Sequence, residues 1–236
     1  MIRIGGDDYH HIVRVMRMKP GDEVGVVFPD GRTAISEIAA IHEDVVELVI
    51  RAWDEKVREL PVDVTIGISL LKKDNFDMVV QKGTELGVSR FIPFISERTV
   101  VKLDERKIVK RMTRWEKIAK EAAEQAERNK IPIIEKPQFL KDLVAKNDEF
   151  DFCCVAYEEA GRNFETKNFL KTLQEMKRGQ TVLFLFGPEG GFHETEIEFM
   201  KEHAFIFCGL GPRILRAETA PLYVLSAISF YFELMR

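Results

Sequence analysis

The feature that most constrains the fold is an alternation of strand-like and helix-like segments that runs from residue 62 to the C-terminus. Short apolar runs in this part of the chain are typical of buried strands, and the stretches between them carry helical periodicity. Such alternation favours an α/β fold with a mostly parallel sheet. General rules of chain topology then predict a doubly wound, right-handed and unknotted arrangement. The strand-like runs are VDVTIGISLL, RFIPFI, residues 132–134, DFCCVAY, TVLFLF and FIFCGL.

The clearest helix is expected after RFIPFI, where apolar residues recur at spacings of three and four. This stripe consists of Ile108, Met112, Trp115, Ala119, Ala122 and Ala126, and the cations Lys107, Lys110, Arg111, Arg114, Lys117 and Lys120 lie off it. An earlier helix is expected from Asp74 as its N-cap to about Leu86, with Gly87 as its stop. Further helices are expected at 140–146, 164–176 and 195–203, and from Thr219 onward.

The first 61 residues follow a different pattern. The short apolar alternations VGVVF, TAISEIAAI and VVELVI are separated by the turn signals KPGD and PDG. Short strands with such turns predict a small β-barrel or sandwich. The polar stretch WDEKVRELP, which ends at Pro61, is expected to link this domain to the α/β domain.

Bulk composition is that of an ordinary soluble protein, with 45% apolar and 31% charged residues. The longest apolar run, APLYVLSAISFYF, is too short to span a bilayer and is expected to form a buried helix. The N-terminus lacks an apolar signal region, so we expect the chain to stay in the cytoplasm. A net charge of −4 gives no support to nucleic-acid binding, but residues 98–136 carry twelve Lys or Arg against seven Asp or Glu. This local excess indicates either RNA-facing patches or solvated helix faces.

Cysteines and histidines show no metal-ligand spacing, so no metal site is expected. Cys153 and Cys154 are adjacent in a strand-like run and should point to opposite faces of the sheet. Together with Cys208 they are expected to be buried structural thiols. Adjacent His10 and His11 would diverge on a strand, and surface or capping roles are expected for the histidines.

Two loops near the end of the chain carry the strongest functional signal. GPEGG, residues 187–191, follows TVLFLF, and LGPRILRAETA, residues 210–220, follows FIFCGL. Loops that follow parallel strands can meet at the carboxyl edge of a sheet and form two walls of one small-molecule pocket. Glycines let the backbone approach a ligand, and Glu189 can accept hydrogen bonds from a ribose or an amine. In the second loop, Arg216, Glu218 and Thr219 precede a helix start whose free amides favour an anionic group.

Missing motifs narrow the choice of ligand. The chain has no GxxxxGK[ST], and no GxGxxG follows its first strand of the α/β part. A phosphate-cradling P-loop, an ordinary dinucleotide site and a Rossmann-type methyl-donor site are therefore disfavoured. GxSxG, CxxC and HExxH are also absent.

Stretches that cover nearly the whole chain match the pattern of one protein family, in order. They are HHIVRVMRMKPGDEV, LLKKDNFDMVVQKGTELGVSRFIPF, SERTVV, RWEKIAKEAAEQAER, FLFGPEGGF and LGPRILRAETAPL. With these stretches the chain resembles the RsmE family of small-subunit (16S) ribosomal RNA uridine N3-methyltransferases, which belong to the SPOUT class of knotted methyltransferases.

The resemblance implies a PUA-like β-barrel for RNA at residues 1–61. It implies a SPOUT-type parallel sheet with a deep trefoil knot at residues 62–236, against the general rule for chain threading. A homodimer with sites near the subunit interface is also implied, with S-adenosylmethionine as the methyl donor. The implied donor-binding residues are Phe186, Gly187, Pro188, Glu189, Gly190, Gly191, Leu210, Gly211, Ile214, Leu215 and Ala220.

For catalysis we expect Arg216 to stabilise charge on the uracil oxygens, Glu218 to accept the N3 proton and Thr219 to orient these groups. Because N3 lies on the pairing edge, the uridine must be unpaired or flipped out. RNA binding is expected at Arg14, Arg17, Lys72, Lys82, Arg98, Arg128 and Arg213. Alternatives are a non-catalytic RNA-binding ribosome assembly factor, and a SPOUT methyltransferase that acts on transfer RNA or on a ribose 2′-hydroxyl.

Two places depart from the family's pattern. After Glu124-Gln125 the family often carries Ser or Cys and then Gly, whereas this chain has Ala126 and Glu127. After GPEGGF the family commonly has a Ser or Thr helix cap, whereas this chain has His193. Glu196 follows three residues later, so half of a capping box is expected.

Overall fold

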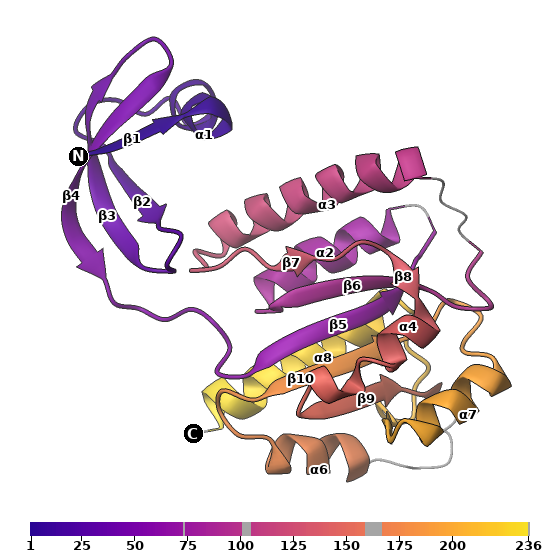
Figure 1. The fold of residues 1–236 in the computed structure, drawn as a ribbon. Coiled ribbons are helices and arrows are strands. Elements are labelled where there is room, and N and C mark those ends of the chain that lie inside the picture. The colour runs from indigo at the N-terminus through magenta and orange to yellow at the C-terminus, as the bar shows by residue number, and fades with distance from the viewer. Residues whose placement is uncertain (73, 101–104, 159–166, 236) are drawn as a thin grey trace. The chain divides into compact units, whose positions relative to one another are not determined.

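The computed structural model describes residues 1–72, 74–100, 105–158 and 167–235, and it divides into two compact units, Met1–Arg58 and Glu59–Arg236. In Figure 1 the first unit is drawn in indigo to purple, and the second runs from purple through magenta and orange to yellow.

The first unit is a four-stranded antiparallel sheet. Its core consists of Ile12, Ile38, Val46 and Leu48, which come from alternate positions of two strands and from the segment after the first strand. The strand order is β1 (Ile2–Gly5), β4 (Val45–Asp54), β3 (Thr33–Ile41) and β2 (Glu23–Val27). The three predicted strands are therefore present, and the sequence did not reveal β1.

The segment after β1 is helical, so His10 and His11 do not lie on a strand, and both are exposed, as expected for surface histidines. It consists of α1 (Gly6–His10) and a π-helical turn (His11–Val15). Asp7 and Asp8 lie in the first turn of α1, where carboxylates are favourable to a helix. The two histidines are thus consecutive helical residues and do not alternate across a strand.

The second unit is built on a parallel sheet of seven strands. The central strands β5 and β10 pair with each other along their full length, from Thr181 opposite Asp63 to Phe186 opposite Ile68. β10 therefore lies between β5 and β9, although it follows β9 in sequence. The spatial order is β11 (Ile206–Cys208), β9 (Phe152–Ala156), β10 (Thr181–Phe186), β5 (Asp63–Ser69), β6 (Arg90–Ile95) and β7 (Ile133–Ile134), with β8 (Gln138–Phe139) also paired to β6.

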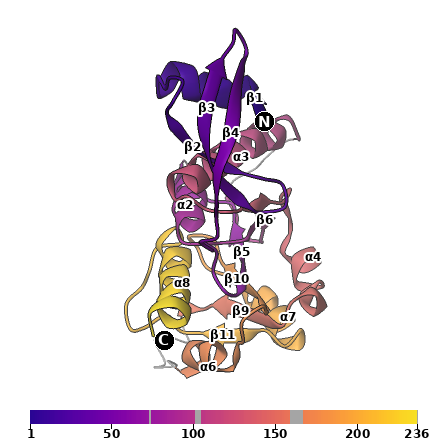
Figure 2. The ribbon, with the colours of Figure 1, turned by 90° about the vertical axis from the view of Figure 1, so that its left-hand side faces the viewer.

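Helices cover both faces of this sheet (Figure 2). One face carries α2 (Asn75–Glu85), α3 (Glu105–Gln125), α6 (Lys167–Glu175) and α8 (Thr219–Ser229), which a π-helical turn (Phe230–Leu234) extends. The other face carries α4 (Leu140–Val144), which a 3-10 turn (Asn147–Glu149) follows, and α7 (Glu194–Glu202). Each predicted helix of this unit is present, and the expected start of α6 near residue 164 lies outside the described residues.

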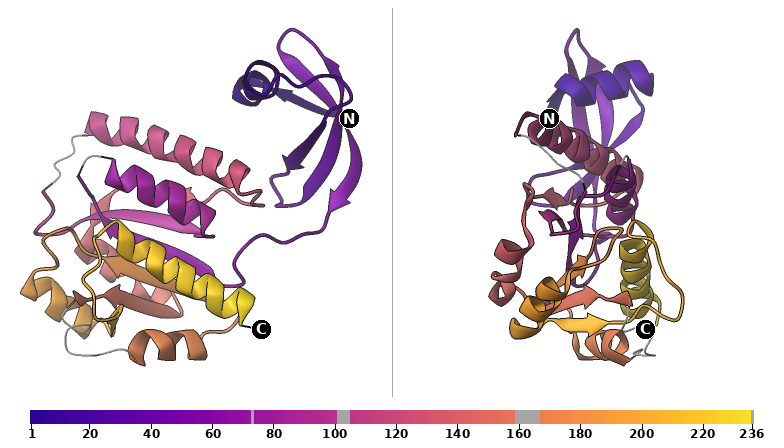
Figure 3. Two further views of the ribbon diagram at one scale, coloured as in Figure 1. Left: turned by 180° about the vertical axis from the view of Figure 1, so that it is seen from behind. Right: turned by 90° about the vertical axis from the view of Figure 1, so that its right-hand side faces the viewer.

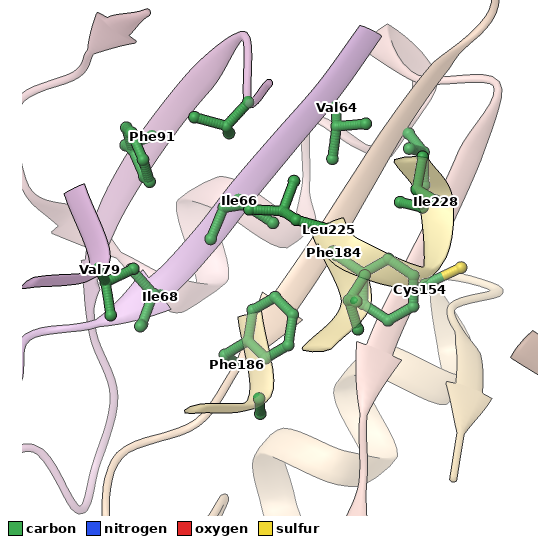
Figure 4. Close-up of a cluster of buried hydrophobic side chains, with 14 of the residues drawn as sticks. Val64, Ile66, Ile68, Val79, Phe91, Cys154, Phe184, Phe186, Leu225 and Ile228 are labelled. Atoms are coloured by element: carbon green, nitrogen blue, oxygen red, sulfur yellow. The ribbon is translucent and has the colours of Figure 1, made fainter. Parts of the chain in front are cut away.

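The main core lies between the sheet and α8 (Figure 4). Leu225 and Ile228 of α8 are fully buried against Ile66 of β5 and Phe184 of β10. Burial of one such side chain stabilises the fold by about 1.5–3 kcal/mol. The run APLYVLSAISFYF thus forms a buried helix, as predicted, and no helix among the described residues is long and apolar enough to cross a membrane.

The thiols confirm the predicted alternation on β9. Cys154 is fully buried in the core under α8, whereas Cys153 packs on the other face of the sheet, next to α4 and α7. Burial, with a smaller contribution from Cys154, raises the pKa of Cys153 to about 12, so this thiol stays protonated at neutral pH. None of the three cysteines forms a disulfide.

Candidate active site

A pocket of about 730 Å³ lies at the carboxyl edge of the sheet, and both predicted loops line it. GPEGG begins where β10 ends, and the second loop connects β11 with α8. The start of α8 lies at the same end of the sheet as α7, as Figure 3 shows from behind. The volume is in the range of small-molecule sites. The predicted convergence of the two loops is therefore present in the fold.

The first loop makes a tight turn and packs against Phe192. Gly191 has φ 70 in the left-handed region, and its N–H donates to Pro188 O at 2.9 Å. A Cβ on Gly187 would lie 3.1 Å from the buried Phe192 ring. The loop thus turns sharply over Phe192 and presents its backbone to the pocket. Glu189 is exposed on this loop and accepts a hydrogen bond of 3.3 Å from Lys72 N–H.

The second loop presents both apolar and charged side chains to the pocket. Ile214 lines the pocket with 64% of its surface exposed, which is a position that a bound apolar ring could cover. Arg216 is almost fully exposed, with 86% of its side chain accessible, whereas Glu218 is 12% accessible. Their closest charged atoms are 3.9 Å apart. The pair thus combines an exposed cation with a shielded carboxylate, for which solvent provides little hydration.

Thr219 begins α8 and does not line the pocket. Its N–H donates to Arg216 O at 2.9 Å, and Ala220 N–H donates to the same oxygen at 3.0 Å. These bonds fix the backbone of Arg216 relative to the first turn of α8. The side chain of Glu218, the N-cap residue, makes no capping hydrogen bond, so its carboxylate is available for another role.

A hydrogen-bond network connects the end of the first loop to the segment after β6. It consists of Glu97, His193, Thr195 and Glu196, and we call it the Glu97 network. Thr195 N–H donates to His193 Nδ1 at 3.3 Å, and His193 N–H donates to Glu196 Oε2 at 2.8 Å. Both halves of a capping box are therefore present, which corrects the expectation of half a box, because the imidazole accepts where Ser or Thr would. Glu97 N–H donates to Glu196 Oε1 at 2.9 Å.

Four of the predicted RNA-binding residues lie near this pocket or on α2. Arg98 and Arg213 line the pocket, and Arg98 Nη1 donates to Gly190 O at 3.0 Å. Lys72 is exposed next to Glu189, and Lys82 is paired with Glu85 at 2.8 Å. Arg14 and Arg17 are exposed in the first unit.

Arg128 does not fit its predicted role. Its side chain is 2% accessible and forms an ion pair with Glu59. Its Nη1 donates to Thr84 O at 2.9 Å and to Val88 O at 2.8 Å. The structure therefore gives Arg128 a structural role, in which it ties the end of α3 to α2, and removes it from the set of residues available to RNA.

The sequence prediction missed Asn75, Tyr157 and Glu158, which also line the pocket. Asn75 begins α2, the helix that follows β5, and Tyr157 and Glu158 directly follow β9. A signal for them existed, because the carboxyl ends of all parallel strands meet at one edge of the sheet. No group of three or more His, Cys, Asp or Glu side chains that could hold a metal occurs within the described ranges.

Comparison with known proteins identifies the family. A profile described as an RNA methyltransferase domain matches residues 58–229, and one described as an RNA methyltransferase PUA domain matches residues 4–51. The ribosomal RNA small subunit methyltransferase E of Bacillus subtilis is 46% identical over 99% of this chain and 91% of its own length. The chain belongs to the RsmE family. This family assignment confirms the resemblance seen in the ordered sequence stretches.

Solved structures of two similar proteins contain the methyl donor. The family member from Neisseria gonorrhoeae, bound to S-adenosylmethionine, has a TM-score of 0.85 at 26% identity, with 98% of this chain and 92% of that one covered. A Legionella pneumophila protein in complex with the same cofactor has a TM-score of 0.83 at 29% identity, with 97% and 90% covered.

The pocket of this chain fits S-adenosylmethionine. Leu210, Ile214 and Leu215 supply an apolar wall for an adenine ring, and Glu189 supplies a carboxylate for ribose hydroxyls or the amino group.

Proposed function

We propose that this protein transfers a methyl group from S-adenosylmethionine to N3 of a uridine in 16S ribosomal RNA. The observation that carries this proposal is that GPEGG and the second loop line the same pocket, in which the shielded Glu218 lies next to the exposed Arg216. Membership of the RsmE family supports the donor and the substrate class. A ribosomal RNA substrate also agrees with the cytoplasmic location expected from the sequence.

The reaction requires three tasks of the protein. The donor supplies an electrophilic methyl group on a sulfonium. The protein must hold the uracil in line with it, which is a positioning task. The N3–H bond of uracil must break before N3 attacks, and we assign the proton to the carboxylate of Glu218. Negative charge then develops on the uracil oxygens, and we assign its stabilisation to the guanidinium of Arg216. The first turn of α8, at Thr219, fixes the backbone of Arg216.

We propose that residues 1–61 act as an RNA-binding domain with Arg14 and Arg17 on its surface, which the match to an RNA methyltransferase PUA domain supports. We propose Lys72, Arg98 and Arg213 as the RNA contacts nearest the pocket. Lys82 is a weaker candidate because Glu85 already neutralises it.

We further propose a homodimer and a knotted chain. Apolar side chains of Tyr223 and Phe230 are 44% and 55% exposed on the outer side of α8 and its extension, a surface that a second copy could cover. Sedimentation equilibrium should then give about twice the monomer mass of 27.2 kDa, and a mass independent of concentration at the monomer value would contradict this. The connection from β9 to β10 includes residues 159–166, which lie outside the described residues.

The replacement Glu218→Gln tests the assignment of the base. It keeps the size of the side chain but removes its ability to accept the N3 proton, so the single-turnover methylation rate should fall by about 10²–10⁴. Donor binding should stay near the wild-type value, which the thermal shift caused by S-adenosylmethionine reports. A variant that methylates at the wild-type rate would exclude Glu218 as the base.

A further inference from the structure

The two halves of α3 carry different charge patterns. Residues 105–114 contain one acid, Glu105, and five cations: Arg106, Lys107, Lys110, Arg111 and Arg114. Residues 115–125 contain two lysines and three glutamates, and its lysines are paired, Lys117 with Glu121 at 3.9 Å and Lys120 with Glu124. We call residues 105–114 the basic half of α3.

The basic half of α3 is unfavourable to the helix that contains it. Cations near a helix N-terminus oppose the positive end of the helix dipole. Arg106 and Lys110, Lys107 and Arg111, and Lys110 and Arg114 are like-charged pairs at the i,i+4 spacing, which repel one another. A helix face that only contacts solvent would be more stable without this clustering of positive charge. Binding of a polyanionic partner would reduce the electrostatic repulsion that is present in the free protein.

Arg114 of the basic half pairs with Asp77 at 2.6 Å, and Trp115 Nε1 donates to the same carboxylate at 2.9 Å. These contacts anchor α3 on α2. Arg106, Lys110 and Arg111 form no ion pair with any described residue, and Arg106 and Lys110 are exposed.

The basic half of α3 lies at the end of the sheet that holds the pocket. In Figure 1 the start of α3 is at the right, the side toward which the β5 arrow points and where α7 lies. Arg114 Nη2 is 3.6 Å from the carboxylate of Asp74, and the neighbouring residue Asn75 lines the pocket. Arg114, the last residue of the basic half of α3, therefore contacts the neighbour of a pocket residue, and the rest of the basic half extends from there to the start of α3.

We propose that Arg106, Lys110 and Arg111 bind backbone phosphates of the RNA substrate as it enters the pocket. This inference rests on the proposed function. The partner is RNA because the family acts on RNA and because the cations are spread along a helix, which suits successive phosphates of one strand. Such contacts position the RNA and carry no base specificity.

The test uses the full chain, in vitro transcribed 16S ribosomal RNA and the variants Lys110→Gln and Lys110→Glu. Each phosphate contact that is lost should lower the slope of log Kd against log salt by about 1. We therefore expect Kd for the RNA to rise by about 3–10-fold at physiological salt for Lys110→Gln. Methylation at saturating RNA should keep its rate, because Lys110 does not line the pocket.

The thermal stability of the free protein provides an independent readout, because it should not fall when the RNA affinity falls. Replacement of Lys110 removes repulsion with Arg106 and Arg114, so the Tm of the free protein should stay equal or rise by about 1 °C. A variant that merely damaged the fold would lower Tm. The matched control is Lys117→Gln in the paired half of α3, which should change neither the RNA affinity nor the salt slope.

Two outcomes separate this inference from the proposed function. If the wild-type protein methylates the RNA but Lys110→Gln and Lys110→Glu bind it with wild-type Kd and salt slope, the phosphate assignment is overturned and the proposed function stands. If the wild-type protein transfers no methyl group to RNA while it still binds RNA with an affinity that depends on Lys110, the proposed function fails and the binding surface stands.

Discussion

At the scale of single residues, Glu127 explains one departure from the family's pattern. It has φ 53, in the left-handed region, directly after α3. Arg128 N–H donates to Ala123 O at 2.9 Å, and Glu127 N–H donates to Glu124 O at 3.1 Å, which together form a Schellman motif. Glycine is the usual residue at such a position because it lacks a Cβ. The family's glycine therefore has a conformational reason, and this chain places a strained residue there.

Replacement of Glu127 should reveal this strain. We expect Glu127→Gly to be more stable than Glu127→Ala by about 1 kcal/mol in the free energy of unfolding, since only glycine adopts this backbone without cost. The comparison of the two variants removes the contribution of the glutamate side chain, and urea denaturation measures it. Equal stability of the two variants would show that position 127 is not strained.

Arg128 shows the limit of prediction at this scale. The sequence indicated a cation in a basic stretch, and charge alone cannot distinguish a solvent-facing arginine from a buried one. The Schellman motif turns the chain after α3, and this turn directs the Arg128 side chain toward Glu59, from which it is separated by 69 positions. Local sequence patterns cannot reveal a partner that lies so far away in the sequence.

At the scale of elements, the Glu97 network determines how the GPEGG loop continues into α7. Glu196 accepts from the N–H groups of both Glu97 and His193, so one carboxylate connects the end of β6 with the start of α7. The sequence predicted the two segments separately. Their connection depends on the parallel register of the sheet and could not be read from local patterns.

Replacement of Glu196 tests this connection. We expect Glu196→Ala to lower the free energy of unfolding by about 1–2 kcal/mol, because two backbone donors lose their acceptor. Donor affinity should fall as well, since the loop that lines the pocket ends at His193. The matched control is Glu198→Ala, whose only ion pair among the described residues is the exposed one with Lys201 at 2.8 Å. Similar losses in both variants, measured by thermal unfolding with and without S-adenosylmethionine, would contradict a special role for Glu196.

Element type was predictable, whereas strand order was not. The runs TVLFLF and DFCCVAY are apolar throughout and were therefore recognisable as buried strands. The insertion of β10 between β9 and β5 is a property of the assembled sheet, because nothing in TVLFLF distinguishes one neighbour from another. The missed strand β1 is short, and only two of its four residues are apolar.

At the scale of the whole molecule, the two motif loops were predictable because glycine, proline and charged residues mark the ends of apolar runs. The structure adds Asn75, Tyr157 and Glu158 to the pocket, from segments after β5 and β9 that carry charged residues but no motif like GPEGG. The division of roles among Arg216, Glu218 and Thr219 stays a prediction, and it depends on the identity of the product.

The product is therefore the most direct test of the account. The wild-type protein should be incubated with 16S ribosomal RNA or the small ribosomal subunit and with S-adenosylmethionine that carries an isotopic label in its methyl group. The RNA is then digested to nucleosides and analysed by mass spectrometry. The account predicts the label in 3-methyluridine. Label in another base or in a ribose 2′-hydroxyl, or no labelled nucleoside from either substrate, would contradict it.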